Sequence, residues 1–112
     1  MEIDDLVGEV LNAVCFVMDY VELHFNGAVL RALSTPVVET AAGMLVFPEF
    51  GSRDALCSLI GAQVLSLDVS DDAQIRIRLA ERGAVTIPLG SSPTGESAHF
   101  VPGWNQPIQV FT

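Results

Sequence analysis

Two histidines stand close to carboxylates and are the residues best suited to chemistry in this sequence. Glu22 and His24 are two residues apart in an alternating stretch, so an extended strand places both side chains on one face. Glu96 and His99 are three residues apart, a spacing that brings side chains together in a helical turn and separates them in a strand. A histidine beside a carboxylate can move a proton or help to bind an anion near neutral pH.

For the first pair we favour a structural interpretation. We expect the strand that carries Arg76 and Arg78 to lie opposite the strand that carries Glu22 and His24. The four side chains would then form cross-strand ion pairs on a solvated sheet face, each contributing about 0.2–1 kcal/mol. The functional alternative is a deep polar pocket in which Glu22, His24 and Arg78 bind an anion or move a proton.

The second pair belongs to residues 91–106, a segment rich in Gly, Ser and Pro that also carries Trp104. We expect a long ordered loop, and loops of this length in compact domains are often functional. A partly exposed tryptophan is a frequent anchor at protein interfaces, so Trp104 is a candidate contact residue. In the simpler interpretation the apolar residues hold the loop to the core while Glu96 and His99 face solvent.

The other requirements for catalysis or metal binding are weakly met. The sequence has no HExxH, CxxC or GxSxG motif and no glycine-rich phosphate signature. Asp68, Asp71 and Asp72 are candidates for a divalent cation, but the glycine and closing glutamate of an EF-hand are missing. Cys15 and Cys57 have apolar neighbours and are expected to be buried free thiols. We therefore expect no cofactor, no metal and no catalytic residue, and we favour a protein without enzymatic activity.

Most of the chain has the period of a β-strand, and two parts of it resemble each other. Residues 6–36 and 59–90 read as copies of one unit, since LVGEVLNAV in the first matches LIGAQVLSL in the second. Asn26-Gly27 predicts a tight hairpin in the first unit, and Gly83 closes a longer turn in the second. A Gly-Ala-Val run follows in both. Each unit therefore predicts a helical turn followed by a three-stranded meander.

The predicted fold is α+β, rich in β-structure, and forms one domain over residues 1–112. We expect two pseudo-repeated three-stranded antiparallel meanders that form a roll or a partly closed barrel, with one short helix and a C-terminal strand. The apolar run MLVF, residues 44–47, is predicted to be a sheet edge that needs a cover. The expected core residues are Val10, Val14, Val21, Leu23, Phe25, Leu56, Ile60, Ile75, Ile77, Leu79 and Ile87.

Composition narrows the possible partners. The chain has fourteen acidic residues and five arginines, with no lysine and a net charge of −9. This balance disfavours nucleic acid and anionic membranes as partners, because both require a basic surface. Half of the residues are hydrophobic and 17% are charged, so we expect a second copy or another protein to cover part of the apolar surface. The acidic N-terminus and the short apolar runs lack the features of a secretion signal or a membrane helix, which indicates a cytoplasmic protein.

The order of these motifs resembles that of small bacterial proteins carried as integron-type mobile gene cassettes or encoded beside toxin-immunity genes. The resemblance rests on the glycine before the meander, the Asp-led strand that runs into RGAV, the ESAHF segment and the terminal IQVF. It implies a compact domain that self-associates or binds another protein, and it transfers no catalytic residue.

The sequence thus predicts a non-enzymatic protein-interaction module that self-associates, most simply as a symmetric homodimer, with Trp104 and the loop of residues 91–106 as the contact region. One alternative is a small-ligand-binding protein or modest enzyme with a polar pocket at Glu22, His24 and Arg78, or at Glu96 and His99. Another alternative is an immunity-type binder of a basic partner, for which the acidic surface is suited.

Overall fold

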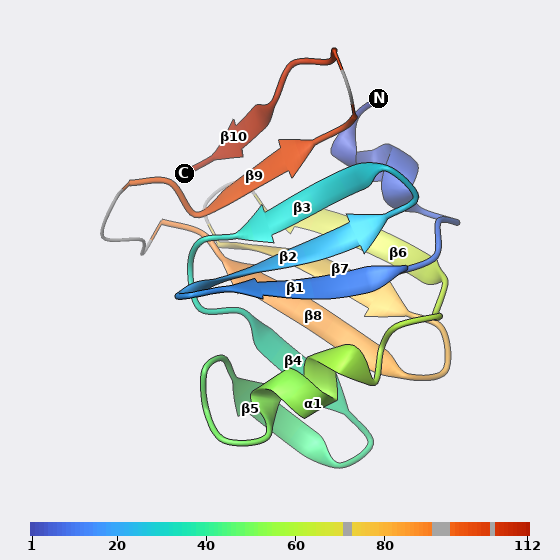
Figure 1. Ribbon diagram of the computed structural model, residues 1–112, viewed down its shortest axis with the longest axis vertical. Coiled ribbons are helices and arrows are strands. Elements are labelled where there is room, and N and C mark those ends of the chain that lie inside the picture. Colours follow the sequence, from blue (N-terminus) through green and yellow to red (C-terminus); the bar gives the residue numbers. More distant parts are fainter. Residues whose placement is uncertain (71–72, 91–94, 104) are drawn as a thin grey trace.

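The computed structural model describes residues 1–70, 73–90, 95–103 and 105–112 and shows two antiparallel sheets stacked face to face (Figure 1). The first sheet has the order β1-β2-β3-β9-β10. Its strands are β1 (Ala13–Val17), β2 (Tyr20–Phe25), β3 (Ala28–Ala32), β9 (Ala98–Val101) and β10 (Gln109–Phe111).

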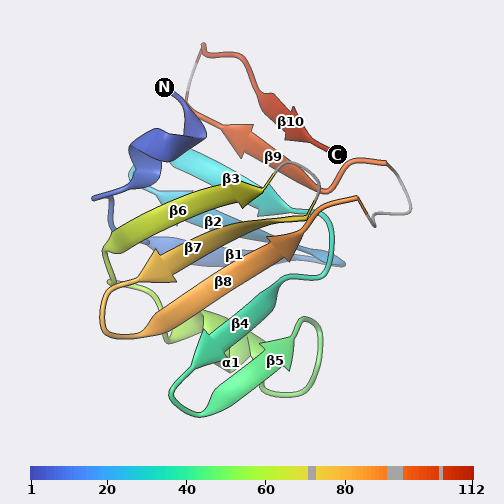
Figure 2. The ribbon, with the colours of Figure 1, turned by 180° about the vertical axis from the view of Figure 1, so that it is seen from behind.

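The second sheet has the order β5-β4-β8-β7-β6 and is in front when the molecule is seen from behind (Figure 2). Its strands are β4 (Val37–Thr40), β5 (Gly43–Val46), β6 (Val64–Ser70), β7 (Gln74–Leu79) and β8 (Gly83–Pro88). Both predicted meanders are present, as β1-β2-β3 and β6-β7-β8. Each meander is then extended by strands from the other half of the chain, because β4 pairs with β8 and β9 pairs with β3.

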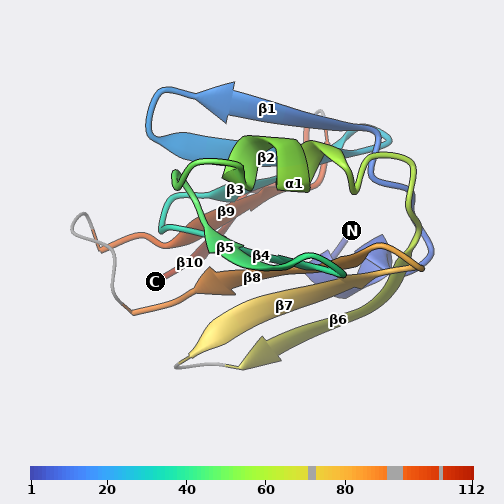
Figure 3. The same cartoon turned by 90° about the horizontal axis from the view of Figure 1, so that it is seen from below.

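The prediction left open a roll or a partly closed barrel, and the strands form two open sheets that do not close into a barrel. Short helices lie between the edges of the two sheets. Figure 3 shows α1 (Ser52–Cys57) in the layer of β1 and β2, above β4 and β5, and α1 contacts all three of β1, β4 and β5. The 3-10 helix η1 (Ile3–Leu6) contacts β6 in a comparable position at the other side. Phe16 of β1 stacks on Phe47, and the Arg53 guanidinium of α1 lies 4.9 Å from the centre of the Phe47 ring. This stack fastens the helix to the sheet edge.

Two short entry segments, residues 8–11 before β1 and residues 61–64 at the start of β6, join the two halves of the chain. They exchange main-chain hydrogen bonds in a reciprocal pattern centred on the bridge between Val10 and Gln63. The four bonds are Gly8 N–H to Val64 C=O (2.9 Å), Gly61 N–H to Leu11 C=O (2.8 Å), Leu11 N–H to Ala62 C=O (2.9 Å) and Val64 N–H to Glu9 C=O (2.8 Å). Both glycines have positive φ, 93° and 96°, which lets the chain turn sharply into each meander.

Both hairpins have the predicted turns: a two-residue turn at Asn26-Gly27, and a longer one between Leu79 and Gly83, which pair across it. Asn26 and Gly27 have φ values of 46° and 99°, so the predicted tight hairpin between β2 and β3 is confirmed. In the second hairpin Glu81 takes the left-handed conformation, with φ of 63°, and Gly83 is the first residue of β8. The two Gly-Ala-Val runs therefore occupy different positions, one starting in a turn and the other starting in a strand.

The inner faces of the sheets form one hydrophobic core. The expected core residues that are buried are Val21, Leu23, Phe25, Leu56, Ile75, Ile77, Leu79 and Ile87. Val14 and Ile60 are partly buried, and Val10 is exposed, while the next residue, Leu11, is the buried position of that entry segment. Cys15 and Cys57 are exposed free thiols, contrary to expectation. Val14 and Phe16 point inward, so Cys15 between them must point outward.

One predicted loop contains a strand. Residues 91–106 were expected to be without regular structure, yet β9 lies within them and pairs with both β3 and β10. Ala98 and Phe100 are fully buried in the core, which explains why this segment forms a strand despite its Gly, Ser and Pro content.

Gly83 is expected to be the most sensitive glycine of the second sheet. A Cβ atom built on Gly83 would lie 1.9 Å from the main-chain oxygen of Glu39, whereas one built on Gly27 would meet nothing within 4 Å. Gly27→Ala should cost about 1–2 kcal/mol for its positive φ. Gly83→Ala should cost a further ~1–3 kcal/mol for the steric clash. Urea denaturation of both variants measures the difference, and equal losses of stability would contradict this packing.

Candidate functional site

Glu22, Arg31 and His99 stand in one row across the outer face of the first sheet. Strand pairing places Glu22 of β2 opposite Arg31 of β3, and Arg31 opposite His99 of β9. The pairs Glu22–His24 and Glu96–His99 are far apart in the sequence but share this face, with Arg31 between them. The structure therefore brings both candidate groups together.

Short contacts join Glu22 to both Arg31 and His24, and join His99 to Glu96. Glu22 Oε2 accepts a hydrogen bond from Arg31 Nε at 2.9 Å, and Glu22 Oε1 lies 3.1 Å from His24 Nε2. His99 Nε2 lies 2.6 Å from Glu96 Oε1. The contact between His99 and Glu96 forms although the two residues are not in a helix, because Glu96 precedes the strand that carries His99.

The surroundings of Glu22 favour its charged form. Its side chain is only 16% exposed, and this burial by itself raises the pKa of the carboxyl group. The hydrogen bonds and positive charges of Arg31 and His24 outweigh burial and hold the pKa of Glu22 below its usual value of 4.5. Glu22 is therefore a poor proton acceptor at neutral pH, and both of its oxygens are already engaged. The geometry supports the predicted cross-strand ion pair, but with a different arginine.

Arg76 and Arg78 lie in β7 of the second sheet, so the expectation that they face Glu22 and His24 is wrong. Arg76 Nη2 is 3.1 Å from Glu39 Oε2. The two meanders belong to different sheets, and in the part of the chain that the structure describes no strand of β1-β2-β3 pairs with a strand of β6-β7-β8, since β9 lies next to β3 and β4 next to β8.

Arg31 is the site residue that sequence reasoning missed. A two-residue turn at Asn26-Gly27 makes Phe25 face Ala28, and counting outward along both strands makes Glu22 face Arg31. The signal for this pair was therefore present in the sequence.

The remaining candidate positions lie outside the described residues. Trp104 is one of them, as are Asp71 and Asp72, so the interface role of Trp104 stays a prediction. Among the residues that are described, no group of three or more His, Cys, Asp and Glu is arranged to hold a metal ion. In the same ranges no helix is long and apolar enough to cross a membrane.

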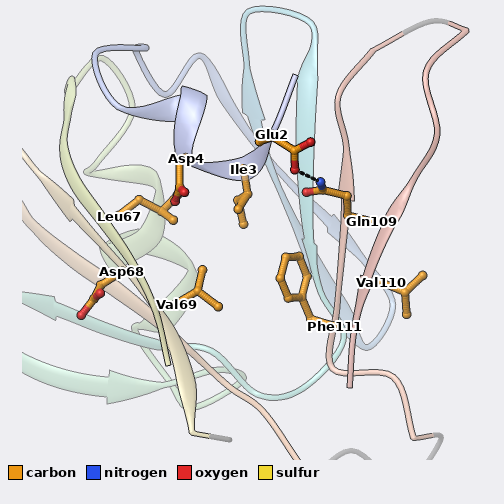
Figure 4. Close-up of a pocket in the computed structure, with 9 residues that line it drawn as sticks. All are labelled: Glu2, Ile3, Asp4, Leu67, Asp68, Val69, Gln109, Val110 and Phe111. Atoms are coloured by element: carbon orange, nitrogen blue, oxygen red, sulfur yellow. Dashed lines mark hydrogen bonds between the residues drawn. The ribbon is translucent and has the colours of Figure 1, made fainter. Parts of the chain in front are cut away.

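A groove of about 810 Å³ opens where η1 lies between the edge strands β6 and β10 (Figure 4). Its apolar lining comes from the side chains of Ile3, Leu67, Val69 and Phe111, and its carboxylates from Glu2 and Asp4. Asp68 of β6 borders the groove, and its carboxylate points away from it (Figure 4). Gln109 spans part of the groove, because its Nε2 donates to the Glu2 carboxylate. The arrangement offers an apolar floor with acidic side chains around it, which no short motif in the sequence indicated.

Comparison of the chain with protein-family models, with curated proteins and with solved structures finds no match. Function must therefore be argued from these surfaces.

The acid stability of the protein should depend on Glu22. A carboxyl group whose folded pKa is lowered stabilises the fold above its unfolded pKa, and this contribution is lost as pH falls through the folded pKa. Glu22→Gln should therefore reduce stability at pH 7 by about 1 kcal/mol and flatten the decline in stability below pH 4.5. Urea denaturation from pH 7 to pH 3 measures both effects, with the exposed Glu81→Gln as control. An unchanged slope for Glu22→Gln would contradict the ion-pair assignment.

Proposed function

We propose that this protein is a non-enzymatic interaction module that forms a symmetric homodimer through the edge of β5. The supporting observation is an uncharged edge strand flanked by exposed apolar side chains. Met44 in β5 is 64% exposed, and Phe50, which follows β5 closely, is 100% exposed. Open edges without charge or proline invite pairing with another chain, and a second copy is the simplest partner.

The free hydrogen-bonding groups of this edge are centred on Met44. The N–H of Val46 donates to the Glu49 carboxylate, and the C=O of Val46 accepts from the Glu49 N–H. The main-chain groups of Val46 therefore point away from β4, but both already have hydrogen-bond partners. Outward-facing residues alternate along an edge strand, so the N–H and C=O of Met44 also point outward. Two copies related by a two-fold axis would pair Met44 with Met44 and exchange two hydrogen bonds.

A cavity beside β5 provides a place for Phe50 of the second copy. The cavity has a volume of about 450 Å³ and lies between β5 and α1. Ala42 and Gly43 line it at the start of β5, whereas Phe50 lies beyond the end of β5. Antiparallel pairing of two β5 strands places the end of one beside the start of the other, so each Phe50 meets the partner's cavity. Such an interface is self-complementary and closed.

The two halves of the chain are, in this proposal, copies of one unit, as the sequence predicts. Support comes from the equivalent strand orders of the two sheets and from the reciprocal hydrogen bonds of the entry segments. The β5 edge and the β10 edge then occupy corresponding positions, and among the described residues only the β5 edge has an exposed phenylalanine beside it, Phe50. We also place the protein in the cytoplasm, where its exposed thiols, Cys15 and Cys57, stay reduced.

Sedimentation tests the homodimer. The unmodified protein should show a concentration-dependent dimer. Met44→Lys should weaken it at least about tenfold, because two like charges then face each other across the axis. Phe50→Ala should weaken it by a similar factor, because the cavity loses its occupant. Val7→Lys, at an exposed apolar position next to η1, is the control and should leave the dimer intact. A strict monomer at high concentration, or equal effects of Val7→Lys and Met44→Lys, would contradict the proposal.

A second candidate function is the binding of a basic partner in the groove between η1, β6 and β10. It is favoured by the carboxylates of Glu2 and Asp4 in an apolar groove, by Asp68 on the neighbouring strand β6, and by the two sheet edges, β6 and β10, that flank the groove. An extended segment with alternating basic and apolar residues can pair with β6 while its basic side chains contact Asp4 and Asp68. This is the chemistry expected of an immunity-type binder.

A peptide of alternating arginine and valine is a direct probe of this groove. Fluorescence titration should show saturable binding that weakens with added salt, since the attraction is electrostatic at the surface. The double variant Asp4→Asn and Asp68→Asn should reduce the affinity at least about tenfold. Asp54→Asn, on α1 at the opposite side, is the matched control. Binding that the double variant leaves unchanged would exclude the groove.

A further inference from the structure

A cavity on the outer face of the second sheet collects most of the positive charge of this acidic chain. Its volume is about 360 Å³, and it lies over β7, β8 and the turn between them. Three of the five arginines, Arg76, Arg78 and Arg82, line it. Glu39 and Glu81 line it as well, so its charged side chains sum to +1 (three positive, two negative), while the whole chain carries −9.

The three guanidinium groups differ in how they are held. Arg76 is fixed by Glu39, with Nη2 3.1 Å from Oε2, and by Thr86, whose Oγ1 accepts from Nη1 at 3.2 Å. Arg82 Nη1 donates to the main-chain oxygens of Ser58, at 3.2 Å, and of Ile60. These bonds leave further N–H donors of Arg82 available, because a guanidinium carries five.

Arg78 is the arginine that remains available. It is exposed and has no hydrogen bond or ion pair with any residue in the described ranges. Arg78 of β7 faces Ala84 of β8, and Ala84 in turn faces Glu39 of β4, so the three residues form one row across the sheet. Since Arg76 already satisfies Glu39, no carboxylate is left in this row to neutralise Arg78.

Small residues create the hollow. Gly83 and Ala84 form part of its lining, and Gly83 has no space for a side chain because its backbone lies against the main chain of Glu39. Leu65 and Leu79 add apolar surface. The hollow is therefore lined more by polar than by apolar groups, and its volume lies within the usual size range of small-molecule sites, about 300–1,000 Å³.

We propose that this cavity binds a small oxyanion, the carboxylate or phosphate group of a small molecule. Arg78 provides the principal contact, since its planar guanidinium can hold two oxygens of the anion at once. Arg82 provides a second donor, and Arg76, held by Glu39, acts as a positioning residue. The proposal is independent of the β5 dimer, because Arg78 and Arg82 lie outside that interface.

Titrations of the full chain with sodium phosphate and with sodium acetate, followed by ¹⁵N NMR at constant ionic strength, test this site. Saturable shifts should be confined to the amides of residues 76–86. Phosphate saturating at lower concentration than acetate identifies a phosphate site, and the reverse order a carboxylate site. Arg78→Gln should weaken binding at least tenfold, and Arg78→Lys should give an intermediate affinity, because lysine keeps the charge but not the planar fork.

Arg53→Gln on α1 is the matched control, since this arginine stacks on Phe16 and Phe47 away from the cavity. Because Arg78 has no described contact to lose, Arg78→Gln should keep the urea midpoint of the unmodified protein, which separates binding from folding. Shifts that sodium chloride reproduces, shifts spread over the whole chain, or equal affinities of Arg78→Gln and Arg53→Gln would overturn the proposal.

Discussion

The reciprocal hydrogen bonds between the two entry segments are the interaction on which the rest of the structure depends. They fix where each meander begins relative to the other, and therefore how the two sheets stack. Leu11 and Val64 in these segments are buried, so the same residues anchor the hydrophobic core between the sheets. The later strands of each half are positioned relative to these segments, including β4, which joins the second sheet, and β9, which joins the first.

The exchange of β4 and β9 between the two halves also determines which surfaces are exposed at the two sides of the molecule. Because each sheet is extended by strands from the other half of the chain, the edge strands of the two sheets do not lie directly opposite each other. The inner face of each such edge then needs another element to pack against it. On one side α1 is this element, fastened by the stack of Phe16, Phe47 and Arg53. On the other side the four-residue η1 covers less, and the acidic groove remains open there. The two proposed contact surfaces thus arise from one architectural cause, while their chemistry differs.

Local patterns in the sequence were sufficient to predict much of this fold. Strand alternation predicts β2 and β7 with their buried residues, Asn26-Gly27 predicts its hairpin, and the uncharged MLVF run predicts an edge that β5 occupies. These features depend on near neighbours in the chain. The same hairpin even contained the register that pairs Glu22 with Arg31.

The parts that could not be predicted depend on distant residues. Nothing near β4 indicates that it pairs with β8, and β9 has only Ala98 and Phe100 as buried positions in a segment with loop-like composition. The stacking of open sheets in place of a barrel follows from those long-range pairings. The arginine cavity was hidden for the same reason, since Arg78 and Glu39 stand in one row, on either side of Ala84, only because β4 pairs with β8.

The exchange of β9 has a consequence for biosynthesis. During translation β3 is made early, yet one of its edges stays without a partner until β9 has left the ribosome. The fully buried Leu30 of β3 and Phe100 of β9 come together only then. The nascent chain therefore carries an open apolar edge through most of its synthesis, and completion of the first sheet is a late event that joins sequence-distant strands.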